Sequence, residues 1–154
     1  MDAYATTYEV RWTDIDANRH VRYSAYIDAA AEQRYRFFSE HDLPPEAFDN
    51  LNVGPVYTTL TATFYREARL GETLTIKYLL SGLSPSGMRW KVRHEFLKAN
   101  GKKAVTVSLE GTILNLTTRQ PSVPTPEIMA VFELVPRSAD FEVLYDSRWF
   151  KPGS

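Results

Sequence analysis

Between Met88 and Phe96 the sequence alternates without a break between apolar or ring-bearing side chains and charged ones. A two-residue period of this kind is typical of a β-strand with one face buried and the other in water. His94 falls on the buried phase, so we expect it to be enclosed and hydrogen-bonded rather than catalytic. A strand that is apolar on one face requires a sheet around it and a second layer that covers that face.

Four other stretches have the composition or alternation of strands: residues 8–12, 56–65, 73–80 and 103–116. Strong turn signals flank residues 88–96, with Ser84-Pro85-Ser86-Gly87 before them and Asn100-Gly101 after them. Strands joined by such tight turns pair antiparallel. The pattern therefore predicts one antiparallel sheet.

One long segment has helical character, from Ala25 to about His41. We expect Ser24 to cap its start and Leu43-Pro44-Pro45 to end it, because the residue before a proline is disfavoured in a helix. Shorter helical pieces are expected around Phe48 and over residues 127–135. Since the long helix is the only element able to cover the sheet, we predict an α+β fold in which a curved antiparallel sheet wraps around one central helix.

A chain of 154 residues is typical of a single domain, 1–154, in which we treat residues 137–154 as a C-terminal extension. A net charge of −1 gives no reason to expect nucleic acid or an anionic membrane as a partner, and no apolar run is long enough to span a bilayer. The absence of cysteine excludes disulfides and a cysteine nucleophile, and it is compatible with the cytoplasm, where we place the protein. The spacing of the three histidines predicts no metal site, and we expect no cofactor.

The polar turn between the first strand and the long helix concentrates reactive groups: Asp14, Asp16, Asn18 and His20. Such side chains are also common in turns for purely structural reasons, because they bond to their own backbone. However, the first N–H groups of a helix have no intrahelical partner and can bind a carbonyl oxygen that becomes negative during acyl transfer. A carboxylate facing the same carbonyl can attack it or activate a water. Because Asp16 lies shortly before the helix start at Tyr23, its carboxylate and the unpaired N–H groups can face the same carbonyl, which favours acyl transfer. For Asp14 we expect only a structural role in the turn.

The run Thr13-Asp14-Ile15-Asp16-Ala17-Asn18-Arg19-His20-Val21, followed by an aromatic helix start, resembles the signature of the hotdog-fold acyl-CoA thioesterases of the 4-hydroxybenzoyl-CoA thioesterase-like family. Its Asp-x-Asn-x-His pattern is similar to that of plant acyl-ACP thioesterases. Phe64–Glu72 resembles the sheet hairpin of the family, and Arg119–Pro124 resembles its strand exit. The resemblance covers roughly residues 7–130 and implies the hotdog fold, which agrees with the architecture that periodicity predicts.

Carried over by this resemblance, Asp16 is the catalytic aspartate and the Tyr23 backbone N–H polarises the thioester carbonyl. Asn18 and His20 match the amide and the imidazole of the acyl-ACP pattern. For the phosphates of CoA we consider three arginines and one glycine that allows close backbone approach: Arg66, Arg69, Arg89 and Gly87. For each arginine taken alone, a solvated strand face is the stronger explanation.

Two departures from the family pattern involve three positions. Arg22 and Tyr23 stand where the plant-type pattern has two asparagines, and Arg19 stands where benzoyl-type enzymes often have glycine. Either arginine can narrow the mouth of the site or bind an anionic group. Some hotdog thioesterases place the base on the helix, where Glu32 stands, but its i,i+4 pairing with Arg36 on the wet face argues against that role.

The resemblance implies hydrolysis of an acyl-CoA or acyl-ACP thioester, with Asp16 as nucleophile or general base. Two alternatives stay open: a hotdog enoyl-thioester hydratase or dehydratase with His20 as base, and a non-catalytic acyl-thioester-binding module. The resemblance also implies a homodimer or homotetramer with the site at the interface between chains. The acyl group is not defined by the sequence.

Overall fold

The structure is a computed structural model that describes residues 3–146. Its helices are α1 (Tyr23–Glu40), α2 (Pro45–Leu51), α3 (Pro126–Leu134) and the short 3₁₀ helix η1 (Trp12–Asp14). Its strands are β1 (Tyr4–Glu9), β2 (Val53–Phe64), β3 (Thr73–Leu83), β4 (Arg89–Leu97), β5 (Lys103–Asn115), β6 (Pro121–Ser122) and β7 (Arg137–Val143).

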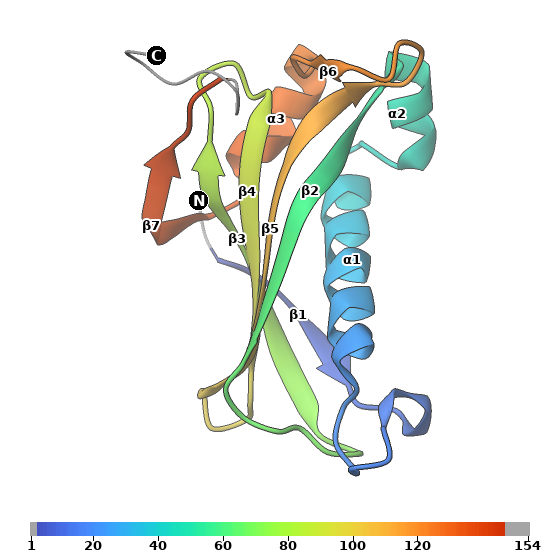
Figure 1. Cartoon of the computed structure of the whole chain (residues 1–154), viewed down its shortest axis with the longest axis vertical. Helices are drawn as coiled ribbons and strands as arrows, with labels where there is room; N and C mark the ends of the chain where they lie inside the picture. The colour runs from blue at the N-terminus through green and yellow to red at the C-terminus, as the bar shows by residue number, and fades with distance from the viewer. Residues whose placement is uncertain (1–2, 147–154) are drawn as a thin grey trace.

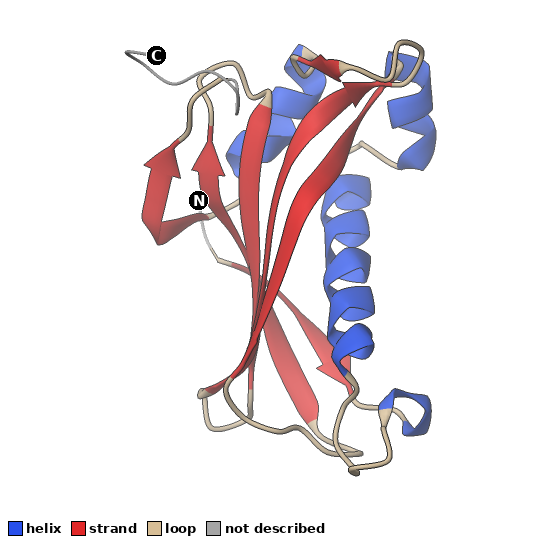
Figure 2. Ribbon diagram, viewed as in Figure 1, coloured by secondary structure: helices blue, strands red, loops and turns tan. Residues whose placement is uncertain are grey.

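The strands form one twisted sheet in the order β1-β3-β4-β5-β2, in which every neighbouring pair is antiparallel (Figure 1). The two remaining strands pair with the last residues of two inner strands, β6 with β5 and β7, in parallel, with β3. Figure 2 shows α1 lying along one face of this sheet. The predicted α+β architecture, an antiparallel sheet around one long helix, is confirmed.

The core forms where the buried stripe of α1 meets the sheet. Ala25 and Ala30 are small and fully buried, which lets the helix approach the strands closely, and Phe37 fills the wider space near the other end. Along β4 the side chains alternate between buried and half-buried positions, as the period in the sequence predicts. His94 is completely buried among them.

The structure corrects two local predictions at the N-terminal side of α1. The first strand ends at Glu9, and Trp12 lies in η1 with 78% of its surface exposed, because the chain turns there to bring Arg11 onto the Asp14 carboxylate. The helix begins at Tyr23 rather than after Ser24, with Arg22 as the N-cap residue and no side-chain cap.

The C-terminal region adds an element that periodicity did not predict. β7 pairs in parallel with the last residues of β3, directly beyond the segment of β3 that β1 covers. Residues 147–154 of the expected C-terminal extension lie outside the described residues. Among residues 3–146, no helix is long and apolar enough to cross a membrane.

Candidate functional site

A pocket of about 350 Å³ lies at the N-terminal end of α1, where the pre-helix turn meets the connection between β2 and β3. It is lined by Asp16, His20, Val21, Tyr23, Tyr26, Phe64, Tyr65, Arg66, Glu67 and Ala68. The floor is aromatic, with the rings of Tyr26 and Phe64 in edge contact at 6.1 Å. The pocket therefore combines ionisable groups at its rim with an apolar wall, the usual composition of a small-molecule site.

Local backbone hydrogen bonds fix the turn that carries Asp16. The Asp16 N–H donates to the His20 carbonyl at 3.0 Å, and the Arg19 N–H donates to the Asp16 carbonyl at 3.1 Å, so the turn closes on itself. Arg19 adopts the left-handed conformation, with φ of +67°. A glycine would suit this position, since glycine reaches that region without steric cost.

The carboxylate itself has two ordered contacts. Asp16 Oδ1 accepts a hydrogen bond from the Asn18 N–H at 2.9 Å, and Asp16 Oδ2 lies 3.3 Å from His20 Nδ1. Asp16 is only half-buried, and water and substrate can therefore reach it. Each carboxylate oxygen therefore has one neighbour and keeps a further lone pair for a water or a substrate.

Tyr23 places a helix N-terminus beside this carboxylate. It is the first residue of the 18-residue helix α1, so its N–H has no partner within the helix, and no other acceptor for it is seen in residues 3–146. A free N–H at a helix N-terminus favours an oxygen that carries negative charge. The pocket thus brings together the two groups that acyl transfer requires, a carboxylate and a donor for the developing oxyanion.

Asp14 has a different environment, although it is only two residues away. Its side chain is 1% exposed and accepts hydrogen bonds from the Tyr8 hydroxyl at 2.6 Å and from the Arg11 N–H at 3.0 Å. The Arg11 guanidinium reaches the same carboxylate at 3.2 Å. Burial alone would raise the pKa of Asp14, but these hydrogen bonds outweigh it and hold the pKa below its usual value. Asp14 therefore joins β1 to the turn and does not face the pocket.

We expect Asp14→Asn to lower the free energy of unfolding by about 2–4 kcal/mol near pH 7, because an amide NH₂ then faces the donors of Arg11. A lowered folded-state pKa stabilises the fold above the pKa of the unfolded chain, and this stabilisation is lost as the pH falls through the folded-state pKa. The difference between wild type and variant should therefore be full at pH 7 and shrink in acid. Urea unfolding from pH 7 downward measures it, with the exposed Asp28→Asn as the control. A difference that does not change with pH would contradict this account.

The structure brings only part of the predicted set together. Asp16, His20, Tyr23 and Arg66 line one pocket, whereas the Asn18 side chain is exposed outside it. The guanidinium of Arg66 donates to the Lys103 carbonyl at 2.8 Å. Sequence reasoning missed the walls contributed by Tyr26, Glu67 and Ala68, although the last two lie in the hairpin stretch that resembles the family.

The other predicted phosphate-binding residues lie elsewhere. Arg69 is exposed beside Glu67, 3.4 Å away, and does not line the pocket. Gly87 and Arg89 lie at the β3–β4 turn, at the opposite end of the molecule from η1 and the start of α1 (Figure 1). Gly87 is left-handed, and the space beside its Cα is filled by Pro124 and by the sulfur of Met129. Its close backbone approach is therefore to α3 and the segment before it. Arg89 forms an ion pair with Glu110.

The structure also shows where Arg22 and Arg19 lie, the two arginines that depart from the family pattern. The Arg22 side chain folds back over the turn, where its Nε donates to the Thr13 carbonyl at 3.2 Å and its guanidinium contacts the Ser24 hydroxyl. Arg19 is exposed. Neither residue lines the pocket.

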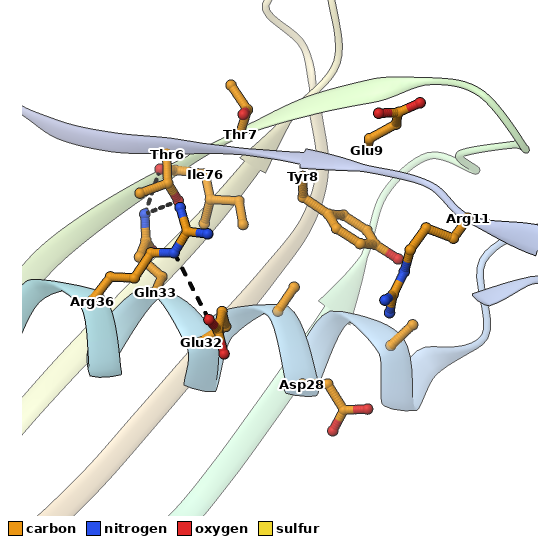
Figure 3. A pocket seen from close by; sticks show the side chains of 12 residues that line it. Thr6, Thr7, Tyr8, Glu9, Arg11, Asp28, Glu32, Gln33, Arg36 and Ile76 are labelled. Atoms are coloured by element: carbon orange, nitrogen blue, oxygen red, sulfur yellow. Dashed lines mark hydrogen bonds and ion pairs between the residues drawn. The ribbon is translucent and has the colours of Figure 1, made fainter. Parts of the chain in front are cut away.

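A larger cavity of about 490 Å³ lies on the other side of α1, between this helix and β1 (Figure 3). Figure 3 shows Glu32 beside Arg36, with 3.8 Å between their charged atoms, and the Tyr8 hydroxyl beside Arg11. Both charged side chains of the Glu32 pair are more than half exposed. This cavity lacks a free helix N-terminus, so we assign the chemistry to the smaller pocket at Asp16. No cluster of three histidine or acidic side chains suited to a metal ion is found in the described part of the chain.

Comparisons with known proteins agree with this architecture. A hypothetical protein from Staphylococcus aureus, solved in complex with CoA, has 20% sequence identity and a TM-score of 0.78 over 90% of this chain and 89% of that one. A 1,4-dihydroxy-2-naphthoyl-CoA thioesterase from Synechocystis has 12% identity and a TM-score of 0.76 over 86% and 97%. A probable thioesterase from Escherichia coli has 18% identity and a TM-score of 0.74 over 86% and 98%.

No curated protein matches the chain. The family model of the Thioesterase-like superfamily matches residues 10–132, a span that begins directly after β1, ends within α3 and includes the whole Asp16 pocket. The predicted resemblance is thereby confirmed, and with it the hotdog fold. The chain belongs to the Thioesterase-like superfamily and is a thioester hydrolase by family.

Proposed function

We propose that this protein hydrolyses an acyl-CoA thioester to a free acid and CoA in the pocket at Asp16. The observation that carries the proposal is that Asp16 and Tyr23, the first residue of α1, line the same pocket. The thioester carbonyl oxygen accepts a hydrogen bond from the Tyr23 N–H, which stabilises the charge that develops there. The carbonyl carbon then faces the carboxylate.

Asp16 acts by one of two balanced routes. As a nucleophile, its oxygen bonds to the carbonyl carbon, the C–S bond breaks, and CoA leaves as a thiolate; water then cleaves the mixed anhydride. As a general base, Asp16 takes a proton from a water whose oxygen attacks the same carbon, and that proton passes to the leaving thiolate. In both routes the His20 contact at 3.3 Å holds Asp16 Oδ2 in place.

Binding of the CoA moiety is proposed to involve Arg66, because it is the predicted arginine that lines the pocket. Arg69 and Arg89 each have an acidic neighbour, which reduces the charge available to a phosphate. Gly87 and Arg89 are at the far end of the sheet, so a contribution from them to this pocket would require a second copy of the chain. Acyl carrier protein as the alternative carrier and a cytoplasmic location both stay predictions from the sequence.

A panel of acyl-CoA thioesters tests the proposed activity. It should contain aromatic, short-chain and long-chain members, with release of the CoA thiol as the readout. Aromatic members are included because one structural relative is named for an aromatic acyl-CoA substrate. We expect at least one member to be turned over at roughly 1 s⁻¹ or faster. Tight binding of all members without thiol release would favour a binding module, and water addition to an enoyl-CoA without thiol release would favour a hydratase.

We also propose that two copies pair through β2. This strand is at the border of the sheet, where its outer hydrogen-bonding edge is unpaired within the described residues. Its exposed aromatic side chains include Tyr57 and Phe64, and Phe64 lines the Asp16 pocket. Light scattering on the active protein should give at least twice the 17.6 kDa mass of the chain. A monodisperse monomer with full activity would rule this out.

A further inference from the structure

A third, smaller cavity of about 160 Å³ lies between α1, the sheet and α3, away from the Asp16 pocket. Its lining includes Arg34 of α1, Tyr57 and Tyr78 of the sheet, and the Trp90 and Phe132 pair, whose rings stack 6.1 Å apart. Arg34 follows Tyr23 by eleven residues on the same helix, which corresponds to about 16 Å. The cavity is therefore separate from the proposed thioester site.

The charge of Arg34 is not neutralised by any acidic side chain within residues 3–146. Its nearest polar partner is His94, whose Nε2 lies 3.0 Å from the guanidinium. No Asp or Glu of the described residues lies within ion-pair distance of Arg34. A half-buried cation without a counter-ion is unusual, because burying an unpaired charge is costly.

The hydrogen bonds around His94 show that this histidine is neutral. Gln33 uses its amide N–H groups on the Ile76 carbonyl at 2.7 Å and the Thr6 hydroxyl at 3.0 Å. Its remaining oxygen must therefore accept from His94 Nδ1, 2.7 Å away, which leaves Nε2 as an acceptor for Arg34. Burial and the nearby Arg34 charge both lower the pKa of His94, in agreement with this tautomer. The histidine binds the guanidinium but supplies no negative charge.

Arg34 has further donors for a ligand in the same cavity. The guanidinium has five N–H donors, and its one side-chain contact in the described region uses one NH group. The Tyr78 ring lines the same cavity and stacks on His94, with 4.9 Å between the ring centroids. By contrast, the Trp90 N–H is already bonded to the Thr112 carbonyl at 3.0 Å. The cavity thus offers an apolar aromatic wall on one side and unused donors on the other.

This combination defines the kind of ligand. A cavity of about 150 Å³ is large enough to hold benzene. The planar guanidinium matches a carboxylate through two parallel hydrogen bonds. We propose that this cavity binds an aromatic carboxylate of about the size of benzoate, with the carboxylate on Arg34 and the ring against Trp90 and Phe132.

The test measures binding of benzoate to the intact protein by calorimetry, in the absence of any thioester, so its result does not depend on the proposed hydrolysis. For a ligand of this size we expect a Kd on the order of 0.1–1 mM. Benzamide has the same shape without the charge and should bind at least about tenfold more weakly. Intermolecular NOEs should connect the benzoate ring protons to the Trp90 indole.

Arg34→Met keeps the apolar stem and removes the charge, and it should weaken benzoate binding at least about tenfold. The control is Arg36→Met, which changes an exposed arginine of the same helix that lines the other cavity; it should leave the Kd within about twofold. The comparison of benzoate with benzamide on the wild type decides the question even if Arg34→Met does not fold. Equal binding of the two ligands, an unchanged Kd in Arg34→Met, the absence of saturable binding, or NOEs to another region would each overturn the proposal.

Discussion

Asp16→Asn is expected to reduce kcat for the best acyl-CoA substrate by about 10²–10⁴-fold, with little change in stability. Asparagine has the same shape and keeps an oxygen that accepts from the Asn18 N–H, so the turn should keep its form. An amide can neither attack the thioester carbonyl nor take a proton from water. Because Asp16 is half-buried, the loss of its charge should cost the fold little.

Asp28→Asn is the matched control for this variant, since it removes an exposed carboxylate of α1 that lines the other cavity. Thiol release under saturating substrate gives kcat, and circular dichroism with urea unfolding checks the fold. The assignment of Asp16 fails if Asp16→Asn turns over substrate at the wild-type rate. It fails equally if Asp28→Asn loses as much activity while it remains folded.

Tyr23→Pro is expected to lower kcat by about 10²–10³-fold, because proline lacks the N–H that is proposed to bind the carbonyl oxygen. The first position of a helix is where proline is best tolerated, since its missing N–H has no role within the helix. The preceding residue must be extended, and Arg22 already has φ of −66° and ψ of 147°. The substitution therefore removes one donor from the pocket and leaves α1 intact.

Tyr23→Ala separates the backbone from the side chain in this experiment. It removes the ring that lines the pocket but keeps the N–H, so its effect should fall mainly on KM, with kcat reduced far less than in the proline variant. Far-ultraviolet circular dichroism should show unchanged helix content in both variants. Equal kcat values for Tyr23→Pro and wild type would remove the backbone N–H from the mechanism.

The strands and the central helix were predictable because their periods are local. In β4 the alternation from Met88 to Phe96 differs from the observed strand, Arg89–Leu97, by one residue at each end. The first strand was placed too late because Trp12 continues the alternation of Tyr8 and Val10. The Asp14 carboxylate ends the strand earlier, because it accepts hydrogen bonds from the backbone and the side chain of Arg11 and so stabilises a turn.

β7 could not be predicted for a related reason. Its sequence, Arg137–Val143, has no clear period of its own, and its strand conformation depends on pairing with β3, more than fifty residues earlier in the chain. Tertiary pairing of this kind is not visible in local composition.

The part of the candidate site that is contiguous in the sequence could be predicted. The part that depends on how the strands are arranged in the sheet could not. Asp16, His20 and Tyr23 lie within one turn and one helix start, so their proximity follows from the chain itself. Arg66 and Arg89 were expected to act together, but Arg66 lies after the end of β2 and Arg89 begins β4, and these two strands run in the same direction. The end of one such strand and the start of the other lie at opposite borders of the sheet. β3, which pairs with β4, has 11 residues and spans about 36 Å. The two arginines therefore cannot meet within one chain.

Two short strands, β1 and β7, share one edge of β3, and this limits how chains can associate. β1 covers residues 73–78 and β7 covers residues 80–83, so that together they leave no stretch of β3 on which a foreign strand could add. Both covering strands are short, and β7 carries Arg137, Asp140 and Glu142, features that discourage further strand addition. In the described residues, β2 is left as the one long open border. If two molecules pair through β2, each covers the open edge of the other. Association then stops at a closed dimer and does not continue as a filament.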